Sequence, residues 1–102
     1  MNAGRIGIVG AGLGGLVAAA ALQRRGFRVA VYEAAPVLGE VGAGVTVTPN
    51  ATRAFRDLGL EPVLRSLGTV PPRQAVKHWQ DGRALVDIPR GTLTEERYGA
   101  GY

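Results

Sequence analysis

The fold is decided by the stretch RIGIVGAGLGGL, residues 5–16. A short apolar run ends in glycines, and a helix-forming run follows. Gly10, Gly12 and Gly15 match the spacing G-x-G-x-x-G, which is typical of a dinucleotide-binding turn. In such a turn the first glycine makes the tight bend, the second lets a pyrophosphate approach the backbone, and the third lets the helix pack closely on the strand. The helix N-terminus offers free N–H groups and a positive dipole end to the phosphates.

The residues around this turn predict a parallel βαβ unit. We expect a strand over residues 5–9, a helix over 13–25 and a second strand over 27–33, with Gly26 as the left-handed residue after the helix. Glu33 follows Gly15 by 18 positions, where a ribose-binding carboxylate is expected. We interpret the whole as a dinucleotide site. The alternative is a glycine-rich structural turn that binds nothing.

The middle of the chain predicts a loop and two short helices. Residues 34–44 form a loop punctuated by glycines, and a short extended piece follows at 45–47. Thr48 and Pro49 have the residue types of an N-cap and a first helical position. Apolar residues at helical spacing then predict one helix that ends at Gly59 and a second over residues 60–67.

The last third of the chain predicts an antiparallel hairpin. Two strand-like runs, 74–80 and 83–88, flank Asp81-Gly82, which favours a two-residue type I′ turn. The residues from Pro89 onward predict a polar tail. Because the pattern changes near residues 70–73, we divide the chain into an N-terminal α/β part, 1–70, and the start of a second domain, 71–102.

Composition excludes several classes of function. The 12 basic and 8 acidic residues are interspersed, so the net charge of +4 forms no basic stripe for nucleic acid. The apolar run of residues 13–22 is too short to span a bilayer, and we expect a soluble, cytoplasmic protein without membrane partners. There is no cysteine and no metal-ligand spacing, so we predict no metal site. The single histidine, His78, is interpreted as structural, and the catalytic residues stay unknown.

Several further motifs follow the glycine turn in a characteristic order. They are VYE at 31–33, LGEVGAGV at 38–45, PNA at 49–51, LGL at 58–60 and HWQDGR at 78–83. Together with GAGLGG they resemble the N-terminal part of the flavin-dependent aromatic hydroxylases, and within that family the salicylate and 3-hydroxybenzoate hydroxylases. The resemblance covers essentially the whole chain.

The resemblance implies an α/β fold: an incomplete, Rossmann-like βαβ FAD-binding unit followed by a β-hairpin that begins a second, substrate-domain sheet. It implies FAD as cofactor, NAD(P)H as reductant and hydroxylation of a small, benzoate-like aromatic substrate. The glycine turn would line the pyrophosphate, Glu33 would bind the adenosine ribose, and the segment around Gly44 would lie near the flavin. The implied cofactor-binding residues are Gly10, Gly12, Leu13, Gly14, Gly15, Glu33, Gly44 and Val45.

Members of that family run to several hundred residues, so we expect the 102 residues to be an N-terminal fragment. Its main partner would be the remainder of its own polypeptide, and the fragment alone would be inactive. Two alternatives stay open. One is an NAD-binding oxidoreductase module with the same fingerprint, and the other is a non-catalytic fragment that folds only with the rest of its protein.

Overall fold

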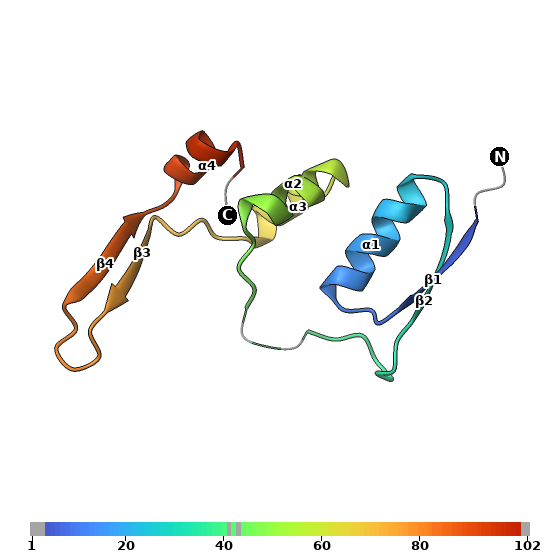
Figure 1. Ribbon diagram of the computed structural model, residues 1–102, viewed down its shortest axis with the longest axis horizontal. Helices are drawn as coiled ribbons and strands as arrows, with labels where there is room; N and C mark the ends of the chain where they lie inside the picture. Colours follow the sequence, from blue (N-terminus) through green and yellow to red (C-terminus); the bar gives the residue numbers. More distant parts are fainter. Residues whose placement is uncertain (1–3, 41, 43, 101–102) are drawn as a thin grey trace. The chain divides into compact units, whose positions relative to one another are not determined.

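The computed structural model describes residues 4–40, 42 and 44–100. The chain forms two compact units, residues 1–43 and 44–102. Figure 1 shows the order of the elements along the chain. The first unit contains β1 (Arg5–Val9), α1 (Leu13–Arg24) and β2 (Arg28–Tyr32). The second contains α2 (Pro49–Asp57), α3 (Glu61–Leu67), β3 (Arg73–Lys77), β4 (Ala84–Pro89) and α4 (Thr92–Tyr98).

The first unit is the expected parallel βαβ unit. β1 and β2 pair in parallel, with Arg5 opposite Arg28 at one end and Val9 opposite Tyr32 at the other. α1 ends one residue earlier than predicted, and Gly26 has φ 85°, the left-handed conformation expected after the helix. The predicted α/β fold class is confirmed: the parallel βαβ unit comes first, and an antiparallel hairpin follows it in the chain.

The two predicted helices of the second unit are confirmed. Thr48 is the N-cap of α2 and Pro49 its first residue, although the Thr48 hydroxyl makes no capping hydrogen bond. Its carbonyl instead accepts hydrogen bonds from the N–H and the Oγ1 hydroxyl of Thr52, at 2.9 and 3.2 Å. Gly59 follows α2 with φ 74°, and α3 has Pro62 in its first turn.

The helix α4 lies within the residues for which the sequence predicted only a polar tail. Arg53 donates a hydrogen bond to the Tyr98 carbonyl, and Arg56 donates one to the Gly99 carbonyl at 3.2 Å. Cationic donors from α2 thus bind carbonyl groups at the C-terminal end of α4, where the helix dipole favours them. Only Leu93 and Tyr98 of the seven residues of α4 are large and apolar, and their spacing is not helical, so the hydrophobic pattern does not identify this helix.

The hairpin of β3 and β4 is present, but the predicted turn type is wrong. The His78 N–H donates to the Arg83 carbonyl at 2.8 Å and the Gly82 N–H donates to the His78 carbonyl at 3.0 Å. Four residues, 79–82, therefore separate the last bonded pair, instead of two. Local side-chain bonds favour the wider loop: His78 Nδ1 accepts from the Gln80 N–H at 3.3 Å, and Asp81 Oδ1 accepts from the Arg83 N–H at 3.1 Å.

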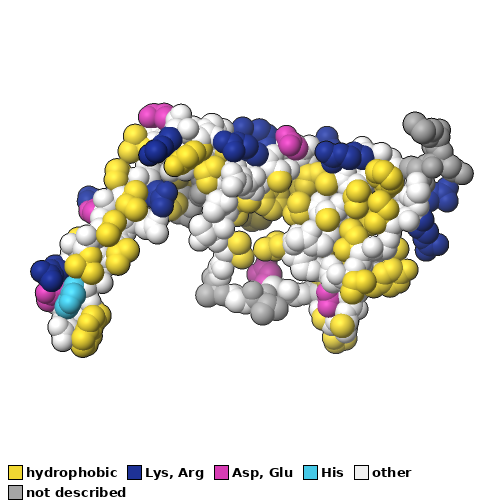
Figure 2. Space-filling model, in the orientation of Figure 1, with side chains coloured by type: hydrophobic (Ala, Val, Ile, Leu, Met, Phe, Trp, Pro, Cys, Tyr) yellow, Lys and Arg dark blue, Asp and Glu magenta, His cyan; other side chains and the backbone are white. Residues whose placement is uncertain are grey.

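Little side-chain surface is buried within the described residues. Thr52 and Ala100 are the only ones of them that are buried, whereas Val9 and Trp79 are 91% and 85% exposed. Hydrophobic side chains accordingly remain on the surface of the hairpin (Figure 2). Each of the two sheets in the described part of the chain has two strands. The predicted domain division at residues 70/71 falls inside the second unit and stays a prediction.

None of the helices in the described part of the chain has the length and apolar character needed to cross a bilayer.

Candidate dinucleotide-binding site

The candidate site is the turn between β1 and α1, which lies against the end of β2. The Gly10 N–H donates a hydrogen bond to the Tyr32 carbonyl at 2.7 Å, so the turn starts directly beside the last residue of β2. Gly10 has φ 97°, a conformation that strains any residue with a Cβ. The first glycine of the fingerprint therefore makes the bend, as the spacing predicted.

Gly15 is required by packing. A Cβ built on Gly15 would lie 2.0 Å from the Gly10 carbonyl oxygen and 3.5 Å from Cγ2 of Ile8. No side chain fits into that space, because the oxygen belongs to the backbone and has no rotamer that would relieve the overlap. α1 thus packs directly onto the turn that precedes it, which is the role expected of the third glycine.

Neither the backbone conformation nor the packing of the chain requires a glycine at Gly12. Its φ of −71° and ψ of 179° suit any residue, and a Cβ at this position would meet nothing within 4 Å. Gly12 is the N-cap of α1, and its carbonyl accepts the Leu16 N–H at 3.0 Å. The N–H groups of Leu13, Gly14 and Gly15 therefore precede the first bond within the helix. Open space above a glycine, next to such donors, suits a phosphate group.

Glu33 lies at the same turn. Its Oε2 accepts a hydrogen bond from the Ala11 N–H at 2.7 Å, and its Oε1 accepts one from the Ala35 N–H at 2.9 Å. These backbone donors, first Ala35 and then Ala11, hold the pKa of the exposed Glu33 carboxyl below its usual range. The side chain is therefore ionised at neutral pH. Sequence reasoning missed both donors, because a backbone N–H has no signature of its own in the sequence.

The structure brings six predicted cofactor-binding residues together in the first unit: Gly10, Gly12, Leu13, Gly14, Gly15 and Glu33. The other two, Gly44 and Val45, belong to the second unit, and their predicted role near the flavin stays a prediction.

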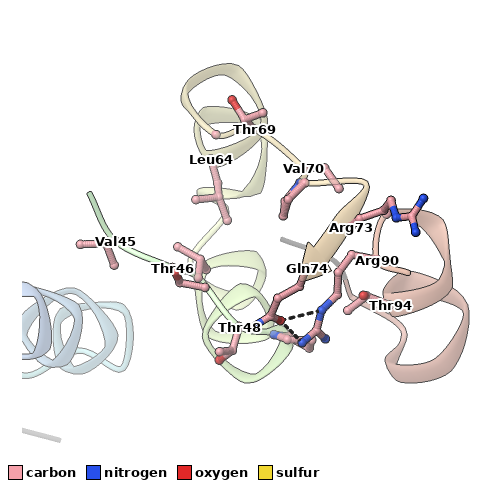
Figure 3. Close-up of a pocket in the computed structure, with 15 residues that line it drawn as sticks. Val45, Thr46, Thr48, Leu64, Thr69, Val70, Arg73, Gln74, Arg90 and Thr94 are labelled. Carbon is pink, nitrogen blue, oxygen red and sulfur yellow. Dashed lines mark hydrogen bonds between the residues drawn. The ribbon is translucent and has the colours of Figure 1, made fainter. Parts of the chain in front are cut away.

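Val45, which is 67% exposed, lines a pocket of about 470 Å³ within the second unit. Figure 3 shows this pocket, with Thr46 and Leu64 among its lining residues. Two cations line the pocket, and both are already bonded: Arg90 Nε donates to Gln74 Oε1 at 3.1 Å, and Arg73 Nε donates to Asp87 Oδ1 at 3.0 Å. His78 is not among the lining residues and lies at the hairpin turn, where its Nδ1 is 3.2 Å from Asp81 Oδ1.

Within residues 4–40, 42 and 44–100, no three acidic or histidine side chains gather closely enough to hold a metal ion.

The sequence of this chain is similar to a known domain family and to several enzymes. The family model of an NAD(P)-binding Rossmann-like domain matches residues 8–55. The chain is 45% identical over 98 residues to 6-hydroxynicotinate 3-monooxygenase of Pseudomonas fluorescens, covering 96% of this chain and 26% of the relative. It is 42% identical to 3-amino-4-hydroxybenzoate 2-monooxygenase of Streptomyces cremeus, covering 96% and 25%, and 41% identical to 3-hydroxybenzoate 6-hydroxylase of Polaromonas naphthalenivorans, covering 93% and 24%.

Solved structures agree with these relatives. Klebsiella pneumoniae HpxO complexed with FAD and uric acid matches with a TM-score of 0.79 and 30% identity, covering 97% of this chain and 24% of that chain. A single-residue variant of HpxO complexed with FAD matches with a TM-score of 0.80 and 29% identity, with the same coverage. The chain spans about a quarter of the length of the curated relatives it matches. In sequence and fold, the chain resembles a part of aromatic monooxygenases, and the solved structures that it resembles are complexes with FAD.

Proposed function

We propose that this chain is the FAD-binding part of an NAD(P)H-dependent monooxygenase that hydroxylates a small aromatic acid. The observation that carries the proposal is Gly12. Its backbone conformation is ordinary, and no atom beyond its chain neighbours lies within 4 Å of the point where a Cβ would stand. A glycine at the N-cap of α1 is therefore explained by a group outside the chain that must approach the backbone.

The residues of the turn would share the binding of FAD. The N–H groups of Leu13, Gly14 and Gly15 would bind the pyrophosphate at the N-terminus of α1. Glu33 would accept the ribose hydroxyls, since a carboxylate has about four lone-pair sites and two are used by Ala11 and Ala35. Bound FAD supplies the electron transfer and oxygen chemistry, and the protein supplies binding and orientation. Gly44 and Val45 are proposed to lie near the flavin.

The names of the relatives support the substrate class. The substrates 6-hydroxynicotinate, 3-amino-4-hydroxybenzoate and 3-hydroxybenzoate each carry a hydroxyl group and a carboxylate on an aromatic ring. We therefore propose an aromatic acid of this type. NADPH or NADH as the reductant is part of the same proposal, as is a cytoplasmic location.

A second candidate, an NAD(P)-binding oxidoreductase module, is favoured by the description of the matching family model. The stretch after Glu33 argues against it. An ordinary Rossmann unit starts its next helix there, whereas residues 34–40, 42 and 44–48 contain no helix. The solved relatives, in addition, are complexes with FAD.

The cofactor is tested in the full-length protein that contains this chain. After purification, the bound nucleotide is released by denaturation and identified by chromatography and flavin absorbance. We expect FAD. Bound NAD(P) without flavin would support the second candidate, and a fully folded protein that binds neither nucleotide would contradict the site itself.

Activity is tested by comparing that protein with the 102-residue chain alone. We expect coupled NAD(P)H oxidation and ring hydroxylation in the full-length protein and no turnover from the chain alone, because reactive intermediates need a closed site that excludes water. We also propose that the remainder of the polypeptide covers exposed side chains such as Val9 and Trp79. Turnover by the chain alone would contradict the expected inactivity, and labelling of Trp79 in the full-length protein as strong as in the chain alone would contradict the covering.

A further inference from the structure

Glu33 has a contact that ribose binding does not explain. Its Oε2 accepts the Ala11 N–H at 2.7 Å, across 22 positions of sequence, and Ala11 lies between the first two glycines of the turn. We propose that Glu33 is also a positioning residue, which holds the glycine turn in the shape that binds the pyrophosphate. This role rests on the proposed FAD site and adds a function to its carboxylate.

The turn needs such a restraint because of its composition. Ala11 is flanked by Gly10 and Gly12, and glycine loses more conformational freedom on ordering than any other residue. Two hydrogen bonds connect this segment to consecutive residues at the end of β2: Gly10 N–H to the Tyr32 carbonyl and Ala11 N–H to Glu33, both at 2.7 Å. The second is charge-assisted, and such bonds are shorter and stronger than neutral ones. A turn ordered before binding loses less entropy when the ligand arrives.

The contact with Glu33 also decides which backbone N–H groups of the turn are left to bind phosphate. The Ala11 N–H is engaged by Glu33, so the phosphate contacts fall to Leu13, Gly14 and Gly15 at the start of α1. The same carboxylate accepts the Ala35 N–H at 2.9 Å through its other oxygen. Glu33 thereby connects the glycine turn to the first residues of the loop after β2.

Glutamine is a poor substitute in this arrangement. Two N–H donors converge on the side chain of Glu33, one on each oxygen. A glutamine amide has one acceptor oxygen and one NH₂ donor, so it satisfies one N–H and directs its own donor at the other. Aspartate retains two acceptor oxygens but is shorter by one methylene. The order of variants by how well they hold the turn is therefore Glu, Asp, Gln.

Two probes separate positioning of the turn from ribose binding. ADP presents a diphosphate and both ribose hydroxyls, whereas 2′,3′-dideoxy-ADP is the same nucleotide without those two hydroxyls. Dissociation constants for both are measured by calorimetry on the full-length apoprotein, for the parent, Glu33→Gln and Glu33→Asp. Glu40→Gln is the matched control, because it removes the same charge from the loop after β2, outside the turn. Thermal melting confirms that each variant is folded.

We expect Glu33→Gln to weaken binding of 2′,3′-dideoxy-ADP by about tenfold, the effect of losing roughly one charge-assisted hydrogen bond. Glu33→Asp should recover part of that loss, and Glu40→Gln should bind like the parent. If Glu33→Gln and Glu33→Asp bind the dideoxy probe like the parent and weaken only ADP, Glu33 acts through the hydroxyls alone and the positioning role is wrong. A parent apoprotein that binds neither probe overturns the proposed FAD site, and the positioning role with it.

Discussion

The turn before α1 and the turn of the hairpin both contain a glycine in the left-handed region, yet the sequence predicted one correctly and the other incorrectly. Gly10 has φ 97° and Gly82 has φ 71°. The first turn has three glycines at a fixed spacing, and the structure shows a separate physical condition at each. The second was predicted from a single dipeptide, Asp81-Gly82, and the observed loop is two residues longer than the predicted type I′ turn.

The two turns differ in whether side-chain hydrogen bonds compete with the turn that the local sequence favours. At the first turn the restraints are backbone groups, such as the Gly10 carbonyl that approaches Gly15. At the hairpin, the side chains of His78 and Asp81 accept backbone N–H groups inside the loop and favour a wider turn. Asparagine, aspartate and similar polar side chains compete with backbone pairing in this way. A prediction based on the pair Asp81-Gly82 alone does not take these side-chain hydrogen bonds into account.

The largest effect is expected from Gly15→Ala. The new Cβ would lie 2.0 Å from the Gly10 carbonyl oxygen, so α1 must move away from the turn. We expect a loss of about 3 kcal/mol or more in the free energy of unfolding, at the upper end for overpacking, together with loss of FAD. Thermal and denaturant unfolding of the full-length protein measure it.

Gly14→Ala is the matched control, because a Cβ there meets nothing within 4 Å in the same helix turn. It should unfold at the parent's temperature or slightly above, since alanine favours helix by up to about 1 kcal/mol over glycine. Equal destabilisation by the two alanines would show that the close approach of Gly15 to Gly10 does not matter.

Gly12→Val tests the glycine that packing does not require. The valine side chain enters open space, so the fold should be kept to within about 1 kcal/mol, while the pyrophosphate loses its approach to the backbone. We expect FAD binding to fall below detection by flavin fluorescence. Gly39→Val, in the loop of the same unit, also meets nothing within 4 Å and should bind FAD normally. Normal binding by both variants would reduce the turn to a structural connection.

Glu33→Ala should have a smaller effect on the same measurement. It removes charge-assisted hydrogen bonds, and we expect about a tenfold to hundredfold loss of FAD affinity. Glu33→Gln should lose less, because the amide still accepts one bond. The expected order of damage is Gly12→Val, Glu33→Ala, Glu33→Gln, and any other order contradicts the assignment of the site.

The smallest effect is expected at the hairpin, from Gly82→Ala. Alanine in the left-handed conformation costs about 1–2 kcal/mol, and the loss should stay local to the hairpin. Amide hydrogen exchange of β3 and β4 in the full-length protein measures it. Gly82→Asn is the comparison, because asparagine tolerates this conformation better and should cost less. Equal protection in the parent and Gly82→Ala would mean that the loop adopts another conformation.

Several features of the chain could be predicted from its sequence because they depend on neighbours in sequence. The spacing of Gly10, Gly12 and Gly15, the apolar strands beside it and the capping residues Thr48 and Pro49 are all local signals, and the elements occur where these signals place them. The motif order indicated the family for the same reason. The binding role predicted for the turn depends on residue types and their spacing, and both are read directly from the sequence.

Tertiary structure alone decided the features that depend on residues distant in sequence. α4 forms where Arg53 and Arg56 of α2 reach its last carbonyls, more than 40 positions away. The hydrogen bond from the Ala11 N–H to Glu33 forms because parallel pairing of β1 and β2 brings the end of β2 beside the glycine turn. Backbone groups are the same at every position of a sequence, so which of them receives a side chain is determined only when the chain folds.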